Sequence, residues 1–141
     1  MSTIEKAIAL AARKHAGQKD KAKQPYIFHP LRLMFKVKTT DQQMVAVLHY
    51  ILEDTDTTVV DLISLGFSHE VVDAIVALTK KEGESRIEAA YRAVKNPIAR
   101  TVKLADVADN MDITRIPDPT TKDLLRLEEY KQVQSILMTA T

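Results

Sequence analysis

Residues 41–54 read DQQMVAVLHYILED and decide the fold class of this 141-residue chain. Apolar side chains recur in this segment at the three- and four-residue spacing of a helix with one buried face. They are Met44, Val45, Val47, Leu48 and Ile51. The pattern predicts a helix over residues 41–52 that packs in a protein core. His49 lies within this helix, and Glu53 follows four residues later, so the two side chains are expected to share one helix face.

Similar helical patterns continue on both sides of this segment. Residues 4–12 form an amphipathic stretch, residues 15–24 are polar and predict a loop, and Pro30 suits the first turn of a second helix. Downstream, residues typical of helix N-termini lie at 55–57, Ser68, Pro97 and Thr120. The helix that follows Ser68 is expected to bury Val71, Val72, Ile75 and Val76. The sequence therefore predicts an all-α helical bundle that forms a single domain over residues 1–141.

The composition narrows the class of function. The chain is 45% hydrophobic and 28% charged, and its 20 basic and 19 acidic residues leave a net charge of +1. A nucleic-acid-binding surface normally needs a clustered basic excess, so no nucleic-acid partner is expected. No cysteine is present, which excludes thiolate metal sites and disulfides. No apolar run is long enough to span a bilayer and no leader-like N-terminus is found, so we expect a cytoplasmic protein without a membrane partner.

Four side chains on three separate segments could form a site for chemistry. His29 precedes Pro30, His49 lies in the predicted third helix, and Asp106 and Asn110 are four residues apart in an apolar helical segment. Two histidines and a carboxylate could converge on one Mn, Fe, Zn or Co ion. Such an ion would acidify a bound water and polarise a phosphoryl oxygen.

Spacing alone leaves other interpretations open. His49 could be a core or surface histidine without a ligand role, and Asp106 could cap a helix or pair with Lys103 or Arg115. His15 and His69 resemble loop and cap residues and receive no predicted role.

Longer segments resemble a known family. They are HAGQ at residues 15–18, PYIFHP at 25–30, LHYILEDT at 48–55, and VKLAD at 102–106 followed by Asn110 and Met111. Their order is similar to that of the HD-type hydrolase domain of the bifunctional alarmone synthetase–hydrolases, and more closely to that of their small stand-alone relatives. The resemblance extends from about residue 4 to residue 135 and implies the HD-domain helical bundle.

The resemblance also implies roles for individual residues. The metal ligands would be His29, His49, residue 50 and Asp106, and the metal is usually manganese in this family. Glu53 and Asp54 would help to activate water, and Asn110 would lie near the substrate ribose or phosphate. The implied reaction removes the 3′-pyrophosphate from guanosine tetra- or pentaphosphate.

Two positions depart from the family pattern. The family's His-Asp doublet reads His49-Tyr50 here, and a phenol with an ordinary pKa of about 10 is a poor ligand unless the ion lowers that pKa strongly. The family's Arg-Lys pair in the first loop reads Asp20-Lys21, which leaves Lys21 as the predicted substrate contact beside a reversed charge. Lys80 and Lys103 are further candidate phosphate contacts.

Three interpretations of Tyr50 follow. His29, His49 and Asp106 could suffice for a metal-dependent pyrophosphohydrolase, the ion could serve a different phosphorylated substrate, or the domain could be a degenerate pseudoenzyme that binds a nucleotide or acts as a regulatory module. The retained carboxylates favour the enzyme, because a buried acidic cluster without a cation would repel itself. The sequence does not decide the oligomeric state. Beside the enzyme and the binding module, an assembly domain that uses the apolar face of the first or last helix remains a further possible function.

Overall fold

A computed structural model of the chain describes residues 2–139. Over these residues the regular structure is helical, apart from an isolated antiparallel bridge between Lys19 and Pro25, and the predicted all-α class is confirmed. The helices are α1 (Ile4–Lys14), α2 (Phe28–Lys36), α3 (Thr40–Val47), α4 (Ile51–Asp54), α5 (Val59–Ser64), α6 (His69–Leu78), α7 (Arg86–Ala93), α8 (Pro97–Asn110), the 3-10 turn Ile113–Arg115, and α9 (Thr121–Thr139).

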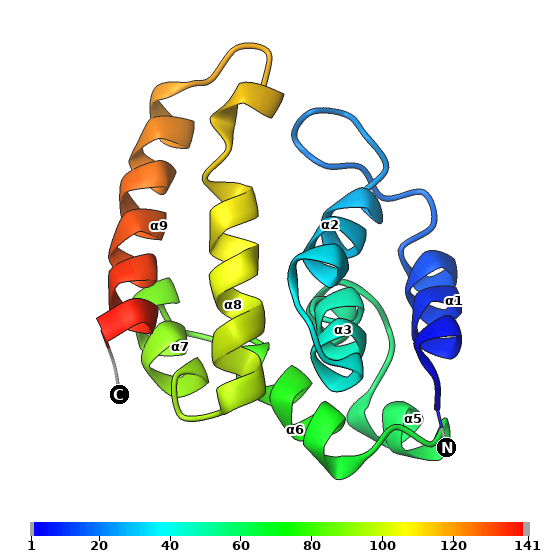
Figure 1. Ribbon diagram of the computed structural model, residues 1–141. Coiled ribbons are helices and arrows are strands. Elements are labelled where there is room, and N and C mark those ends of the chain that lie inside the picture. Colours follow the sequence, from blue (N-terminus) through cyan, green and yellow to red (C-terminus); the bar gives the residue numbers. More distant parts are fainter. Residues whose placement is uncertain (1, 140–141) are drawn as a thin grey trace.

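Helix α3 is the centre of the main core. Its last four residues, Met44 to Val47, are buried, and the helix packs against α1, α2, α6 and α8. Figure 1 shows α3 between these neighbours, with α9 alongside the outer face of α8. A smaller apolar cluster of Ala90, Val107, Val133 and Leu137 joins α7, α8 and α9. Helix α8 therefore contributes to both clusters and links the two parts of the core.

The predicted continuous helix over residues 41–52 is wrong at its C-terminal end. Helix α3 stops at Val47, residues 48–50 form a turn, and α4 begins at Ile51. Within this turn the Ile51 amide donates to the carbonyl of Leu48 at 3.0 Å, which is tighter than the helical i to i−4 pattern. Successive side chains in an α-helix diverge by about 100°. The turn instead stacks the rings of His49 and Tyr50, with centroids 4.1 Å apart and planes 15° apart.

Several predicted helix starts are observed. Ser68 caps α6 by accepting from the Val71 amide, and Pro97 lies in the first turn of α8. Thr120 and Asp123 exchange hydrogen bonds at the start of α9. The cap expected at residues 55–57 is instead Thr58, which forms a capping box with Asp61. Val76, expected to be buried, is 39% exposed.

Two loops that are distant in the sequence lie at the same end of the bundle. One joins α1 to α2 and the other joins α8 to α9, and both are at the top of Figure 1. This end of the molecule holds the cavity described below. No helix within residues 2–139 combines the length and apolar character needed to cross a membrane.

Arg92 on α7 ties its helix to the end of α6. Its guanidinium donates to the carbonyl oxygens of Val76, Ala77 and Thr79 at 2.7–3.3 Å and binds Glu84 at 2.8 and 3.0 Å. We expect Arg92→Ala to lower the free energy of unfolding by about 2 kcal/mol, because half-buried carbonyl groups lose charged donors. Urea unfolding followed by circular dichroism measures this change. The exposed Arg13→Ala variant is the control, and equal losses in the two variants would contradict the structural role of Arg92.

Candidate active site

The carboxylate of Asp106 is the centre of the candidate site. The residue is fully buried on α8 and accepts hydrogen bonds from four side chains. His29 Nε2 lies 2.8 Å from Oδ1, the Tyr50 hydroxyl 3.1 and 3.0 Å from the two oxygens, Lys103 Nζ 2.8 Å from Oδ2, and Asn110 Nδ2 3.1 Å from Oδ1. The structure thus brings together three of the predicted residues, His29, Asp106 and Asn110. Tyr50, at the position of the missing ligand, joins the same cluster.

Local helix geometry places the donors from α8. Lys103, Asp106 and Asn110 are three and four residues apart, so they share one face of the helix. His29 comes from the first turn of α2, and Tyr50 from the turn between α3 and α4. Because α2 and α3 both pack against α8, the two rings reach the carboxylate from the opposite side.

His49 completes the cluster without a hydrogen bond. Its ring is 1% exposed, Nε2 lies 3.8 Å from Asp106 Oδ2, and neither ring nitrogen has a hydrogen-bond partner. Burial lowers the pKa of His49 to about 3, so the imidazole is neutral at physiological pH. Buried polar groups without partners are uncommon in folded proteins and costly to stability. A neutral imidazole held in this way has a lone pair available for a metal ion.

Asp109 is a functional candidate that the sequence analysis missed. Its Oδ2 lies 2.5 Å from His29 Nδ1, so both nitrogens of this imidazole contact carboxylates. Arg32 donates to the two Asp109 oxygens at 2.8 and 3.0 Å, and Arg115 Nη2 lies 3.4 Å from Oδ2. Its position one helical turn after Asp106 was an available signal. A carboxylate on the second nitrogen of a histidine fixes the ring's orientation and increases its basicity.

The protonation states follow from burial and neighbouring charges. Burial alone would lower the pKa of His29, but the hydrogen bonds to Asp106 and Asp109 outweigh it and raise this pKa. Burial, together with the charge of Asp106, raises the pKa of Tyr50 well above its ordinary value. Burial opposes ionisation of Asp106, yet the charge of Lys103 and the hydrogen bond and charge of His29 hold its pKa well below the usual range. Tyr50 therefore acts as a neutral donor to an ionised carboxylate.

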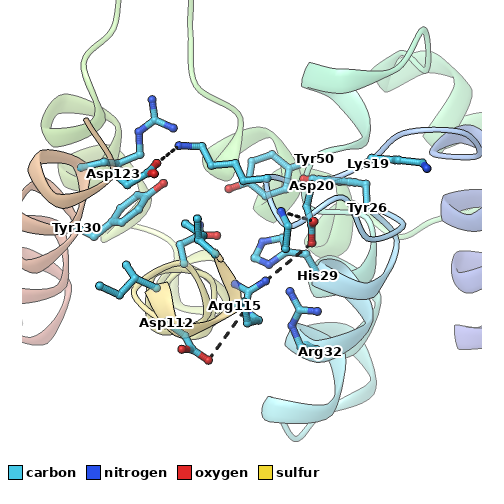
Figure 2. Close-up of a pocket in the computed structure, with 16 residues that line it drawn as sticks. Lys19, Asp20, Tyr26, His29, Arg32, Tyr50, Asp112, Arg115, Asp123 and Tyr130 are labelled. Carbon is cyan, nitrogen blue, oxygen red and sulfur yellow. Dashed lines mark hydrogen bonds and ion pairs between the residues drawn. The ribbon is translucent and has the colours of Figure 1, made fainter. Parts of the chain in front are cut away.

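A cavity of about 320 Å³ opens beside this cluster, between the two loops and α9. Figure 2 shows His29, Tyr26 and Tyr50 on one side and Asp123 and Tyr130 of α9 on the other. Lys21, the predicted substrate contact, lines the cavity, but its ammonium pairs with Asp123 at 2.7 Å. This ion pair connects the first loop to α9. Lys21 must exchange this partner before it can bind a phosphate.

The predicted catalytic carboxylates lie apart from each other. Glu53 lines a second cavity of about 200 Å³, and its Oε1 accepts the Lys80 amide at 2.5 Å. Asp54 lines neither cavity, and its hydrogen bonds are made by its backbone: the amide donates to the Tyr50 carbonyl at 3.0 Å and the carbonyl accepts from Gln18 Nε2 at 2.9 Å. Gln18 in turn contacts His15 Nδ1 at 2.9 Å, so His15 is a buried loop anchor. Burial raises the pKa values of both Glu53 and Asp54.

The imidazoles of His29 and His49 and the carboxylate of Asp106 are groups that bind divalent ions. The distances between their atoms, however, are those of a hydrogen-bonded cluster. Within residues 2–139, no group of three or more His, Cys, Asp or Glu side chains is arranged to hold a metal ion. His29 Nε2 contacts Asp106 directly, and Tyr50, Lys103 and Asn110 donate to the same carboxylate. An ion would satisfy one of the two unpartnered ring nitrogens of His49, the one that carries the lone pair.

The pH dependence of stability tests the charge state of His29. The pKa of His29 is raised on folding, so its stabilising contribution is fully present below about pH 6.5 and is lost as the pH rises through the folded-state value. We expect the metal-free protein to lose unfolding free energy above pH 6.5 in urea titrations. The His29→Gln variant should show a flatter dependence in this range, and an identical pH profile would contradict the assignment.

The chain was compared with known proteins. No family model matches it. It is 31% identical over 120 residues to the guanosine-3′,5′-bis(diphosphate) 3′-pyrophosphohydrolase of Aquifex aeolicus. This match covers 77% of this chain but only 17% of that protein. The proteins named MESH1 from Drosophila melanogaster and Mus musculus are 30% and 34% identical, and each match covers 85% of this chain and 74% of the relative.

A solved structure, described as a metazoan ortholog of SpoT that hydrolyses ppGpp, has the same fold. It matches with a TM-score of 0.80 over 99% of this chain and 87% of that chain, at 22% identity. The predicted HD-type fold is thereby confirmed. The identity to both MESH1 proteins and the length of those matches show that this chain belongs to the HD-type alarmone hydrolase family that MESH1 represents.

Proposed function

We propose that this protein is a metal-dependent pyrophosphohydrolase that removes the 3′-pyrophosphate from guanosine tetra- or pentaphosphate. The relatives named above support the reaction class and the small nucleotide substrate. The observation that carries the proposal is the convergence of His29, His49 and the buried Asp106, with the His49 nitrogens unpartnered. A nucleotide substrate also agrees with the expected cytoplasmic location.

His29, His49 and Asp106 would hold the ion, which we propose to be manganese. A divalent ion at such a site lowers the pKa of a water molecule and polarises a phosphoryl oxygen. Asp109 would keep the imidazole of His29 in position. Tyr50 would keep its proton and donate to Asp106, so it would replace the family's fourth ligand without supplying a negative charge.

Other residues would bind the substrate and move protons. Glu53 is suited to accept a proton from water, because its raised pKa lies closer to neutrality than that of an ordinary carboxylate. Asn110 lines both cavities and would contact the ribose or a phosphate, while Lys21 would bind a phosphate after release from Asp123. Asp54 keeps its proposed catalytic role only if its side chain turns toward the site.

A second candidate is a nucleotide-binding module without turnover. It is favoured by one observation, namely that Asp106 is fully hydrogen-bonded by protein groups alone. Lys103 and the protonated His29 would then supply the positive charge in place of an ion. This candidate predicts saturable nucleotide binding that does not depend on added metal.

Hydrolysis of guanosine tetraphosphate tests the proposed reaction. With manganese, the natural protein should release pyrophosphate and guanosine diphosphate, as resolved by anion-exchange chromatography. We expect Asp106→Ala to lower kcat/KM by at least about 100-fold, because removal of this carboxylate would abolish ion binding. The exposed Asp73→Ala variant on α6 serves as the control. Nucleotide binding without any release of pyrophosphate would favour the second candidate instead.

Metal content tests the role of Tyr50 separately. After manganese loading and desalting, elemental analysis should find near one ion per chain in the natural protein. Tyr50→Asp restores the family's carboxylate, so we expect it to bind manganese at least about tenfold more tightly. An ion bound by Tyr50→Asp but absent from the natural protein would mean that the scaffold persists without its catalytic metal.

A further inference from the structure

Asp109 is a buried carboxylate on α8 that lies on the opposite side of the His29 ring from Asp106. Asp106 Oδ1 is 2.8 Å from Nε2 of this imidazole, and Asp109 Oδ2 is 2.5 Å from Nδ1. The two nitrogens of an imidazole direct their hydrogen bonds away from each other. The ring of His29 therefore separates the two carboxylates. Asp109 is not placed to contact an ion held by Nε2 and Asp106, and its route to such an ion passes through His29.

Neighbouring cations keep Asp109 ionised and hold its side chain in place. Arg32 contacts both oxygens, with Nε 2.8 Å from Oδ1 and Nη2 3.0 Å from Oδ2, and such bidentate contacts fix the plane of a carboxylate. Arg115 Nη2 lies 3.4 Å from Oδ2, and Lys36 Nζ lies 3.5 Å from Oδ1. The side chain of Asp109 is 5% exposed, whereas those of the three cations are 31–45% exposed. Water therefore screens the cations more than it screens the carboxylate.

The Asp106 side of the site carries one negative charge fewer than the family's His-Asp doublet would give it. Tyr50 donates its hydroxyl to both oxygens of Asp106, at 3.1 and 3.0 Å, and burial keeps this phenol protonated. Of the three proposed ligands, Asp106 alone is an anion. A divalent ion at this buried position would keep one uncompensated positive charge, which is costly away from water. A second anion close to the ligands would lower that cost.

We propose that Asp109 supplies, through His29, the negative charge that Tyr50 does not supply as a ligand. Asp109 is then the positioning residue that allows a site with tyrosine at residue 50 to hold a divalent ion. This inference rests on the proposed function and adds the residue on which the affinity for the ion depends. Because Nδ1 of His29 donates to Asp109, the lone pair of the neutral ring lies on Nε2, the nitrogen that faces Asp106.

A purely structural role for Asp109 makes a different prediction. Asp109 also fastens α2 to α8, because His29 and Arg32 are both residues of α2. If fastening were its sole role, loss of Arg32 and loss of Asp109 would both displace His29 and would weaken ion binding alike. If the charge of Asp109 is what acts, the two losses differ in direction, because Arg32 offsets that charge.

The Kd of manganese, measured on the full chain by competition with a fluorescent chelator, tests the proposal. Asp109→Asn keeps the shape of the side chain and removes its charge, and we expect it to raise this Kd at least about tenfold. Arg32→Gln should leave the Kd within about twofold or lower it. Asp112→Asn is the matched control, because it removes the same charge just after α8 at a carboxylate that contacts Thr114 and Arg115. Its Kd should stay within about twofold of the natural protein.

The Tyr50→Asp background tests whether Asp109 compensates for Tyr50. In this background a carboxylate lies among the ligands, and His29 is one of four ligands instead of one of three. We expect Asp109→Asn to raise the manganese Kd less than about threefold there, so the effects of the two substitutions are not additive. Equal losses in the natural and Tyr50→Asp backgrounds would contradict the compensation. Circular dichroism verifies that each variant is folded.

The outcomes separate this inference from the proposed reaction. Equal weakening by Asp109→Asn and Arg32→Gln, equal weakening by Asp109→Asn and Asp112→Asn, or no manganese bound by the natural protein would overturn the role of Asp109. Hydrolysis of guanosine tetraphosphate together with unchanged manganese binding by Asp109→Asn would reject that role and keep the reaction. Selective loss of manganese from Asp109→Asn, in a protein whose natural form hydrolyses no guanosine tetraphosphate, would keep the role and reject the reaction.

Discussion

The buried negative charge of Asp106 is the constraint on which the rest of the site depends. An ionised carboxylate removed from water is stable only when hydrogen bonds and opposite charges compensate for its lost hydration. Here α2, the turn after α3, and two other positions of α8 each supply a donor. The packing of α2 and α3 against α8 therefore stabilises the charge of Asp106 as well as burying apolar side chains.

The same constraint explains why α3 ends where it does. A continuous helix through residue 52 would turn His49 and Tyr50 about 100° apart, so only one ring could face Asp106. Ending the helix at Val47 lets both rings stack and approach the carboxylate from one side. The turn replaces regular backbone hydrogen bonding with side-chain contacts at the place where the candidate chemistry lies.

Tyr50 and Asp109 together redistribute charge around His29. Tyr50 contributes a neutral hydroxyl at the position where the family's His-Asp doublet has a carboxylate. Asp109 contributes a carboxylate on the other side of the His29 imidazole. Arg32 and Arg115 compensate the charge of Asp109. In the lining of the first cavity, the Lys21–Asp123 ion pair joins the first loop to α9.

The sequence by itself determined the helical class, most helix starts and the identity of the residues that surround Asp106. These features depend on local periodicity, on capping chemistry and on motifs that lie within a few consecutive residues. Whether each site residue performs its predicted role stays a prediction, which the sequence supports through family resemblance alone. Only the tertiary structure decided the break after Val47, the contact of Asp109 with His29, the pairing of Lys21 with Asp123, and the second cavity. Contacts such as these join residues 80 and 102 positions apart, and local sequence patterns carry no information on which distant side chains will meet.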